Sequence, residues 1–254
     1  MAAGVVMGMV LSTAAHADVN DAGLKAYKRY GIDKIDAALA GAKDLKAKVV
    51  AKDVAGAQAA WKKARVGWEG AEVFTGEFFS ELDEKIDAWP DAKSGFHAIE
   101  APLFAGELDA IGPQVDDLVA NLQEFDTKLK AKDFAFTGQG LINGAAGLAY
   151  EIGDNKSKGG ESQFAGTSLV DIKNNMIGID ATFDNVFEKP LSKKDAKFAK
   201  KLDAQVDAVL DMVKKAKDMK AVDQDKLRAA GEELAVDFQT AAEKLGLQKP
   251  KLGD

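Results

Sequence analysis

The chain has 254 residues, of which 46% are hydrophobic and 30% are charged, so it can bury the core of one large or two small domains. Its formal net charge of −7 disfavours nucleic acid and other polyanions as direct partners. The absence of cysteine excludes disulfides and thiolate metal sites, so any metal must be held by oxygen and imidazole. Abundant Ala, Lys, Asp, Glu and Leu predict an all-α protein, because these residues lose little entropy in a helix or favour its ends.

The chain begins with an apolar stretch that ends in Ala15-His16-Ala17. Small residues at these positions are typical of a secretory signal, so we expect residues 1–17 to be a signal peptide cleaved after Ala17. Residues 18–254 are then expected to form a single helical-bundle domain in the periplasm. No later segment approaches the roughly 20 apolar residues that membrane spanning needs, so we expect a protein that is not membrane-spanning.

Apolar residues recur at helical spacing along most of the chain. The expected helices cover residues 22–50, 54–74, 96–104, 113–132, 138–152, 168–187, 192–217 and 223–245. Asp53 is the expected N-cap of the second helix, Pro113 lies in a first turn, and Pro190 is expected to separate two late helices. Residues 76–90 are expected to be irregular, and residues 153–166, rich in glycine, to form an exposed loop. Short connections between so many helices predict a helical bundle, arranged as two four-helix layers.

Two acidic motifs at helical spacing are the candidate metal ligands. His97 and Glu100 form a His-x-x-Glu motif, and residues three apart on a helix share one face and can bind one ion. Glu69 and Glu72 form a second pair with the same spacing, and Asp87 lies between the two pairs in the sequence. Paired side chains of this kind, on facing helices, build the metal sites of di-iron bundle proteins.

A purely structural interpretation stays open for each pair. Glutamate pairs at helical spacing are common on solvated faces, and a lone histidine is more often structural than a ligand. His97 is flanked by the apolar residues Phe96, Ile99 and Leu103, however, which indicates a partly buried face on which Glu100 needs a partner.

Three segments in order carry a resemblance to a known family: residues 65–72, 82–88 and 95–103. Together with residues 151–180, they resemble the imelysin-like family, and most closely the C-terminal domain of EfeO-type periplasmic iron-uptake proteins. Because an N-terminal cupredoxin domain is lacking, the chain looks like the shorter, EfeM-type form.

The resemblance implies a periplasmic helical bundle that binds iron or another divalent cation and serves an inner-membrane iron permease of the Efe type. Carried over by position, the metal ligands would be Glu69, Glu72, Asp87, His97 and Glu100. Such a donor set suits Fe, Mn or Zn, and its many carboxylates favour iron as Fe2+ or Fe3+, with Fe(III) preferred among oxidation states.

Two other functions remain as alternatives. The imelysin-like family has been classed as a peptidase, but zinc hydrolases generally use two or three histidines. Once His16 leaves with the signal, His97 is the only histidine, so we expect no enzyme activity. Some relatives are similar to alginate-binding proteins, but an acidic protein repels an acidic polysaccharide unless a cation or a basic cleft intervenes.

Overall fold

The computed structural model describes residues 19, 21–89 and 93–253, so the expected signal peptide lies outside the described residues. The α-helices are α1 (Asp21–Val50), α2 (Val54–Glu69), α3 (Glu72–Asp87), α4 (Gly95–Phe104), α5 (Gly112–Lys130), α6 (Gly138–Asp154), α7 (Ser168–Thr182), α8 (Glu188–Lys215) and α9 (Gln224–Lys244). The fold is an all-α helical bundle, as the sequence predicts. None of the described helices combines the length and apolar character needed to cross a membrane.

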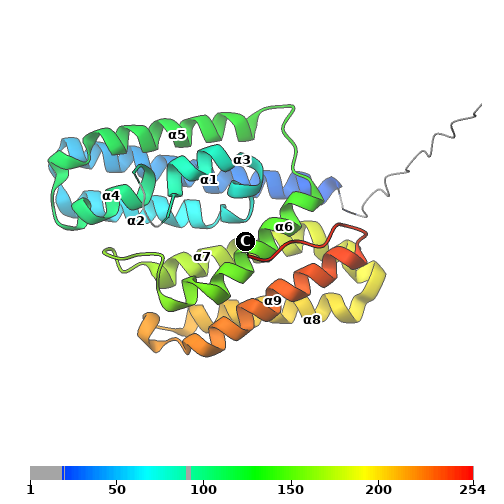
Figure 1. The fold of residues 1–254 in the computed structure, drawn as a ribbon. Helices are drawn as coiled ribbons and strands as arrows, with labels where there is room; N and C mark the ends of the chain where they lie inside the picture. Colours follow the sequence, from blue (N-terminus) through cyan, green and yellow to red (C-terminus); the bar gives the residue numbers. More distant parts are fainter. Residues whose placement is uncertain (1–18, 20, 90–92, 254) are drawn as a thin grey trace, which may run out of the picture.

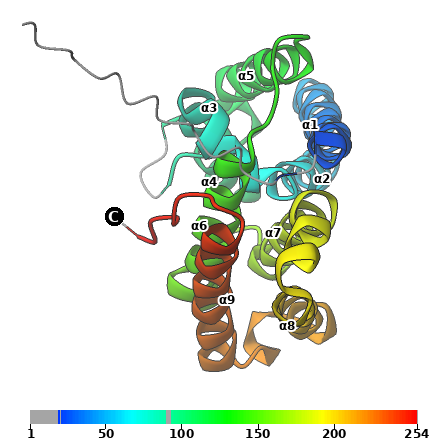
Figure 2. The same cartoon turned by 90° about the vertical axis from the view of Figure 1, so that its right-hand side faces the viewer.

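The helices form two groups, one above the other in Figure 1. Helices α1 to α5 make the upper group and α6 to α9 the lower one, and the view in Figure 2 shows the same division. Helix α2 packs on α7 and α3 packs on α6, which joins the groups. One continuous cluster of buried apolar side chains runs through both groups, from Tyr27 in α1 to Leu245 after α9.

Helix ends follow local capping chemistry at several predicted positions. The Asp53 side chain accepts a hydrogen bond from the amide of Gly56 at the start of α2, and Pro113 lies in the first turn of α5. Asp223 accepts from the amide of Lys226 and begins α9. Each cap satisfies an amide that has no partner inside the helix.

The expectation of an irregular stretch over residues 76–90 is wrong, because α3 continues through Gly76 to Asp87. The chain turns earlier, at Gly70 and Ala71, where Tyr30 Oη donates to the carbonyl of Gly70. A single non-helical residue, Phe79, bends α3. This bend follows from tertiary packing, since Phe79 lies against Phe125 and Phe134 with ring centroids 4.4 and 4.9 Å apart.

Pro190 does not separate two helices. A π-helical turn over Phe183–Phe187 carries α7 directly into α8, and Pro190 lies in the first turn of α8. The real break comes at Asp195, whose backbone is not helical. The Asp195 carboxylate accepts from the amide of Phe198 and pairs with Lys244 on α9, so it caps the longer part of α8.

Candidate metal centre

Arg65 of α2 is the centre of a polar cluster buried between the two groups of helices. Its side chain is fully buried and forms ion pairs with Glu69 and Asp87. Arg65 Nη2 also lies 3.5 Å from Glu161 and 3.9 Å from Asp171. A buried guanidinium needs such partners, because desolvation of an unpaired charge is very costly.

Asp87 at the end of α3 links Arg65 to the histidine of α4. Its second oxygen accepts a 2.7 Å hydrogen bond from Trp68 Nε1, and its first lies 3.2 Å from His97 Nε2. Burial alone would lower the pKa of His97, but the adjacent carboxylates of Asp87 and Glu100 outweigh it and raise the pKa to about 9. His97 Nδ1 is buried and has no hydrogen-bond partner, so this ring nitrogen can bind a ligand once the imidazolium loses a proton.

Glu100 anchors the loop that follows α6. Its Oε1 accepts hydrogen bonds from Ser162 Oγ at 2.7 Å and from the amides of Phe164 and Ala165 at 3.1 and 2.8 Å. Burial would raise the pKa of Glu100, but the nearby imidazolium of His97 and the hydrogen bonds from these loop donors lower it to about 2. The Oε2 atom lies 4.0 Å from His97 Nδ1. Glu100 therefore holds the loop with one oxygen and faces His97 with the other.

The expectation of an exposed loop over residues 153–166 is only partly correct, because residues 154, 155, 158, 163, 164 and 166 are exposed but others are not. Lys156, Ser157, Ser162 and Ala165 are all buried, and the loop covers the polar cluster. A Gly-rich stretch predicts irregular backbone correctly, but its long-range hydrogen bonds to Glu100 are invisible to local sequence patterns.

Glu69 and Glu72 are joined by Asn175 of α7. Asn175 Nδ2 donates to Glu69 Oε2 at 2.7 Å and also to Glu72 Oε2. Burial raises the pKa of both carboxyl groups, for Glu72 to about 7 with a contribution from the nearby charge of Glu161. Asn175 Oδ1 is buried without a partner, so this side of the cluster also has a free oxygen.

Lys156, in a short turn after α6, is the second buried cation. Its side chain is 2% exposed, and Nζ lies 2.7 Å from Glu72 Oε1 and 3.2 Å from Glu161 Oε1. The surrounding carboxylates raise the pKa of Lys156 well above its usual value, although burial acts in the opposite direction. The ammonium group is therefore charged in the folded protein.

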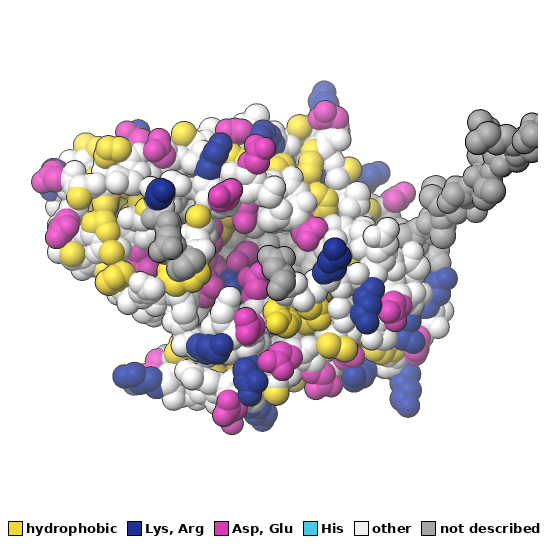
Figure 3. All heavy atoms as spheres, in the orientation of Figure 1, with side chains coloured by type: hydrophobic (Ala, Val, Ile, Leu, Met, Phe, Trp, Pro, Cys, Tyr) yellow, Lys and Arg dark blue, Asp and Glu magenta, His cyan; other side chains and the backbone are white. Residues whose placement is uncertain are grey.

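Carboxyl groups outnumber cationic side chains in this cluster. Its carboxyl groups belong to Glu69, Glu72, Asp87, Glu100, Glu161 and Asp171. The cationic side chains in contact with them are Arg65, Lys156 and, when protonated, His97. Six acids thus face three cations, and a seventh, Glu151, lies 3.9 Å from Lys156 Nζ. Figure 3 shows acidic side chains gathered in the hollow at the middle of this face. Burial also raises the pKa of Asp171 to about 7 against the opposing effect of Arg65.

All five predicted ligands lie in this cluster, but they do not converge on one point. Asp87, His97 and Glu100 form one group, Glu69 and Glu72 form another, and Arg65 contacts members of both. Among the described residues, no three His, Asp or Glu side chains are arranged to hold an ion. The ligand set remains a prediction, because Arg65 and Lys156 pair with these carboxylates in the structure.

Sequence reasoning assigned no role to Arg65, Lys156, Glu161, Asp171 or Asn175. Asp171 and Asn175 stand four apart on α7 and therefore share a face, a local signal that was available. Arg65 also had a local signal, because it pairs with Glu69 four residues on in α2. Its burial had none, since its partners Asp87 and Asp171 lie far away along the chain.

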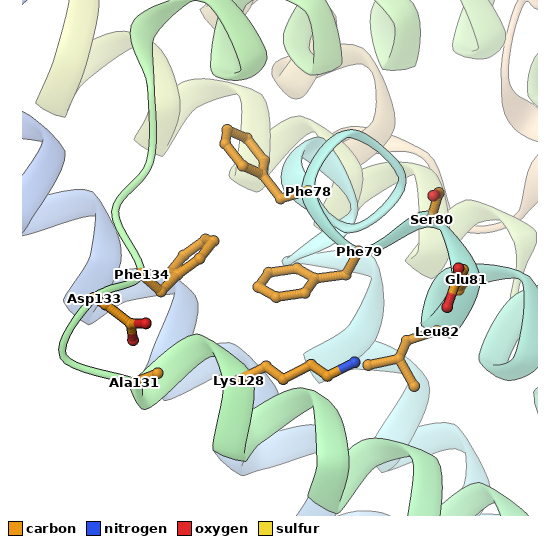
Figure 4. Close-up of a pocket in the computed structure, with 9 residues that line it drawn as sticks. All are labelled: Phe78, Phe79, Ser80, Glu81, Leu82, Lys128, Ala131, Asp133 and Phe134. Atoms are coloured by element: carbon orange, nitrogen blue, oxygen red, sulfur yellow. The ribbon is translucent and has the colours of Figure 1, made fainter.

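A separate pocket of about 550 Å³ lies between α3 and the end of α5 with the chain that follows it. Figure 4 shows that Phe78, Phe79 and Phe134 line it with Lys128 at one side. The rings of Phe79 and Phe134 pack on each other, and Lys128 is paired with Glu124 at 2.8 Å. Buried charge gathers at the Arg65 cluster instead, which is the better candidate site.

The protein is therefore an all-α helical bundle with carboxylates and one histidine clustered between its two groups of helices. The family model for imelysin, peptidase family M75, matches residues 23–94 and 91–247, so the chain belongs to the imelysin family, as the resemblance predicted.

Individual relatives agree with this assignment. The chain is 30% identical over 205 residues to an EfeM/EfeO family lipoprotein of Staphylococcus aureus, covering 76% of this chain and 71% of the relative. It is 28% identical over 241 residues to the iron uptake system component EfeM of Pseudomonas syringae, covering 89% and 83%. A solved structure from Parabacteroides distasonis, described as an iron-regulated protein A precursor, superposes with a TM-score of 0.69 at 16% identity, covering 89% and 96%. This last likeness shows the fold alone.

Proposed function

We propose that this protein is a periplasmic metal-binding protein that binds iron for delivery to an inner-membrane permease. The observation that carries the proposal is the buried excess of carboxylates around Arg65 and Lys156. Buried carboxylates are costly unless protons or cations balance their charge. The raised pKa values of Glu69, Glu72 and Asp171 favour protons in this role, and a bound metal ion would replace these protons. The relative named as an iron uptake system component supports iron as the bound ion. The relative named as a lipoprotein supports export from the cytoplasm.

The unpartnered atoms of the cluster fit such an ion. His97 Nδ1, Asp171 Oδ1 and Asn175 Oδ1 are buried without hydrogen-bond partners, and Glu100 Oε2 faces His97. One imidazole nitrogen among several carboxylate oxygens matches iron, manganese or zinc and disfavours Cu(I), which prefers sulfur. The chain therefore offers a mixed oxygen and nitrogen site for a hard or borderline cation.

We propose further that the site is not a peptidase centre, despite the name of the family. Catalytic zinc sites commonly use three protein ligands, most with at least two histidines, and keep an open position for water. His97 is the only histidine in residues 18–254. A polysaccharide-binding role has less support, because Lys201 on α8 is already paired with Asp237 and Glu233 and is not free to bind an acidic polymer.

The test is equilibrium binding of Fe2+ under anaerobic conditions, and of Fe3+, Mn2+ and Zn2+, by the purified chain. We expect about one ion per chain, with iron favoured by the carboxylate-rich donor set. His97→Ala should abolish or greatly weaken binding, because it removes the single imidazole. Gln58→Ala is the matched control, since it removes a half-buried polar side chain whose hydrogen bond goes to Leu103, away from the cluster.

Unchanged iron affinity in His97→Ala would refute the site assignment. Metal-dependent cleavage of peptides by the purified chain, lost in the same variant, would support the peptidase alternative.

A further inference from the structure

The two buried cations of the cluster are held very differently. Arg65 projects from the middle of α2, and its guanidinium lies 5.4 Å from the ring centroid of Phe96 and 5.8 Å from that of Trp61. It is fully buried and surrounded by four carboxylates. Because Arg65 projects from a regular helix and its guanidinium group is packed against two aromatic rings, this group cannot move out of the cluster.

Lys156, in contrast, belongs to a short irregular segment. It begins the turn Lys156–Lys158, which is followed by Gly159 with φ +78°. The long, unbranched lysine side chain has many rotamers, and the turn is not part of a regular helix. Of the two cations, Lys156 is the one whose charged group can move.

A cavity next to Lys156 gives its ammonium group a place to go. The cavity has a volume of about 170 Å³, and Glu72, Asp83 and Glu151 are among the residues that line it. Lys156 Nζ already lies 3.9 Å from Glu151 Oε2. Lys156 Nζ thus contacts two of the carboxylates that line the cavity, Glu72 and Glu151, although Lys156 itself does not line it.

We propose that Lys156 is a displaceable internal cation that competes with the metal for Glu72 and Glu161. Without metal, the ammonium group neutralises these carboxylates, and on metal binding it swings toward Glu151 in the cavity. Its displacement lowers the affinity for the ion and speeds its release, which suits a protein that must hand on its cargo. This role rests on the proposed iron binding.

The first experiment compares Lys156→Met with the wild-type chain in competition with a chromogenic Fe2+ chelator. Removal of a positive charge a few ångströms from the ion should tighten Fe2+ binding about tenfold or more and slow dissociation correspondingly. Lys156→Gln, which keeps hydrogen-bond donors toward Glu72, should act in the same direction and serves if the methionine variant fails to fold. Lys158→Met is the matched control, because Lys158 lies in the same turn and is exposed.

The second experiment follows the lysine itself in the wild-type chain, by acetylation of amines and mass spectrometry with and without Fe2+. Acetylation of Lys156 should increase when the ion binds, while that of Lys158 should stay constant. A lysine with a merely structural role would not change its reactivity.

The outcomes separate the two proposals. Fe2+ binding by the wild type with equal or weaker binding by both Lys156 variants would overturn the role of Lys156 and leave iron binding intact. An absence of binding by every one of these proteins would overturn both.

Discussion

Replacement of Glu100 by glutamine should loosen the loop that covers the carboxylate cluster. One Glu100 oxygen accepts three hydrogen bonds from the loop, from Ser162 Oγ and from the amides of Phe164 and Ala165. Hydrogen bonds to charged groups contribute about 1.5–3 kcal/mol, against about 0.5–1.5 kcal/mol for neutral pairs. Because a glutamine oxygen still accepts hydrogen bonds as a neutral group, we expect the free energy of opening the loop to fall by about 2 kcal/mol.

Amide hydrogen exchange measures this opening directly. A change of about 2 kcal/mol corresponds to roughly 30-fold faster exchange at the amides of Phe164 and Ala165. Amides in α1, which packs mainly on α2 and α5, should exchange as in the wild type. Glu107→Gln is the control, because Glu107 is an exposed glutamate just after α4, the helix that carries Glu100.

Two results would contradict the reasoning. Unchanged exchange at both loop amides would mean that the Glu100 charge does not hold the loop. Equal acceleration in the loop and in α1 would mean that the substitution lowers global stability instead.

Two further predictions concern the pH dependence and the packing of the two groups of helices. In the metal-free chain, the imidazole of His97 should titrate with a pKa of about 9 in NMR spectra. Because folding raises this pKa, the protonated imidazole stabilises the folded state by roughly 3 kcal/mol below pH 6.5, and this stabilisation is lost as the pH rises to about 9. A titration midpoint near 6.5 would contradict the pairing with Asp87. Gly144→Ala should destabilise the fold by about 1–3 kcal/mol in urea denaturation, because a Cβ atom there would lie 1.7 Å from the carbonyl oxygen of Val73. Gly147→Ala on the same helix meets nothing within 4 Å and should stabilise it by about 0.5–1 kcal/mol, and equal effects of the two variants would refute the close approach of α3 and α6.

Helix positions were largely predictable, because helical periodicity and caps are local properties. Asp53 and Pro113 stand where their chemistry predicts helix starts. The errors came at Gly76 and Pro190, where tertiary packing and a π-helical turn overrode the local preference for a break. Glycine and proline change the backbone energy by only a few kcal/mol, which packing can outweigh.

The side-by-side placement of His97 and Glu100 was determined by the sequence alone, since three residues on a helix bring two side chains to one face. Likewise, the lack of cysteine left oxygen and imidazole as the only strong donors. The tertiary structure decided that Arg65 and Lys156 lie among the acids and that the loop after α6 covers them. Lys156 meets Glu72 across 84 positions of the chain, and Asn175 meets Glu69 across 106. Such pairings depend on how α2, α3 and α7 pack, and no local spacing encodes them.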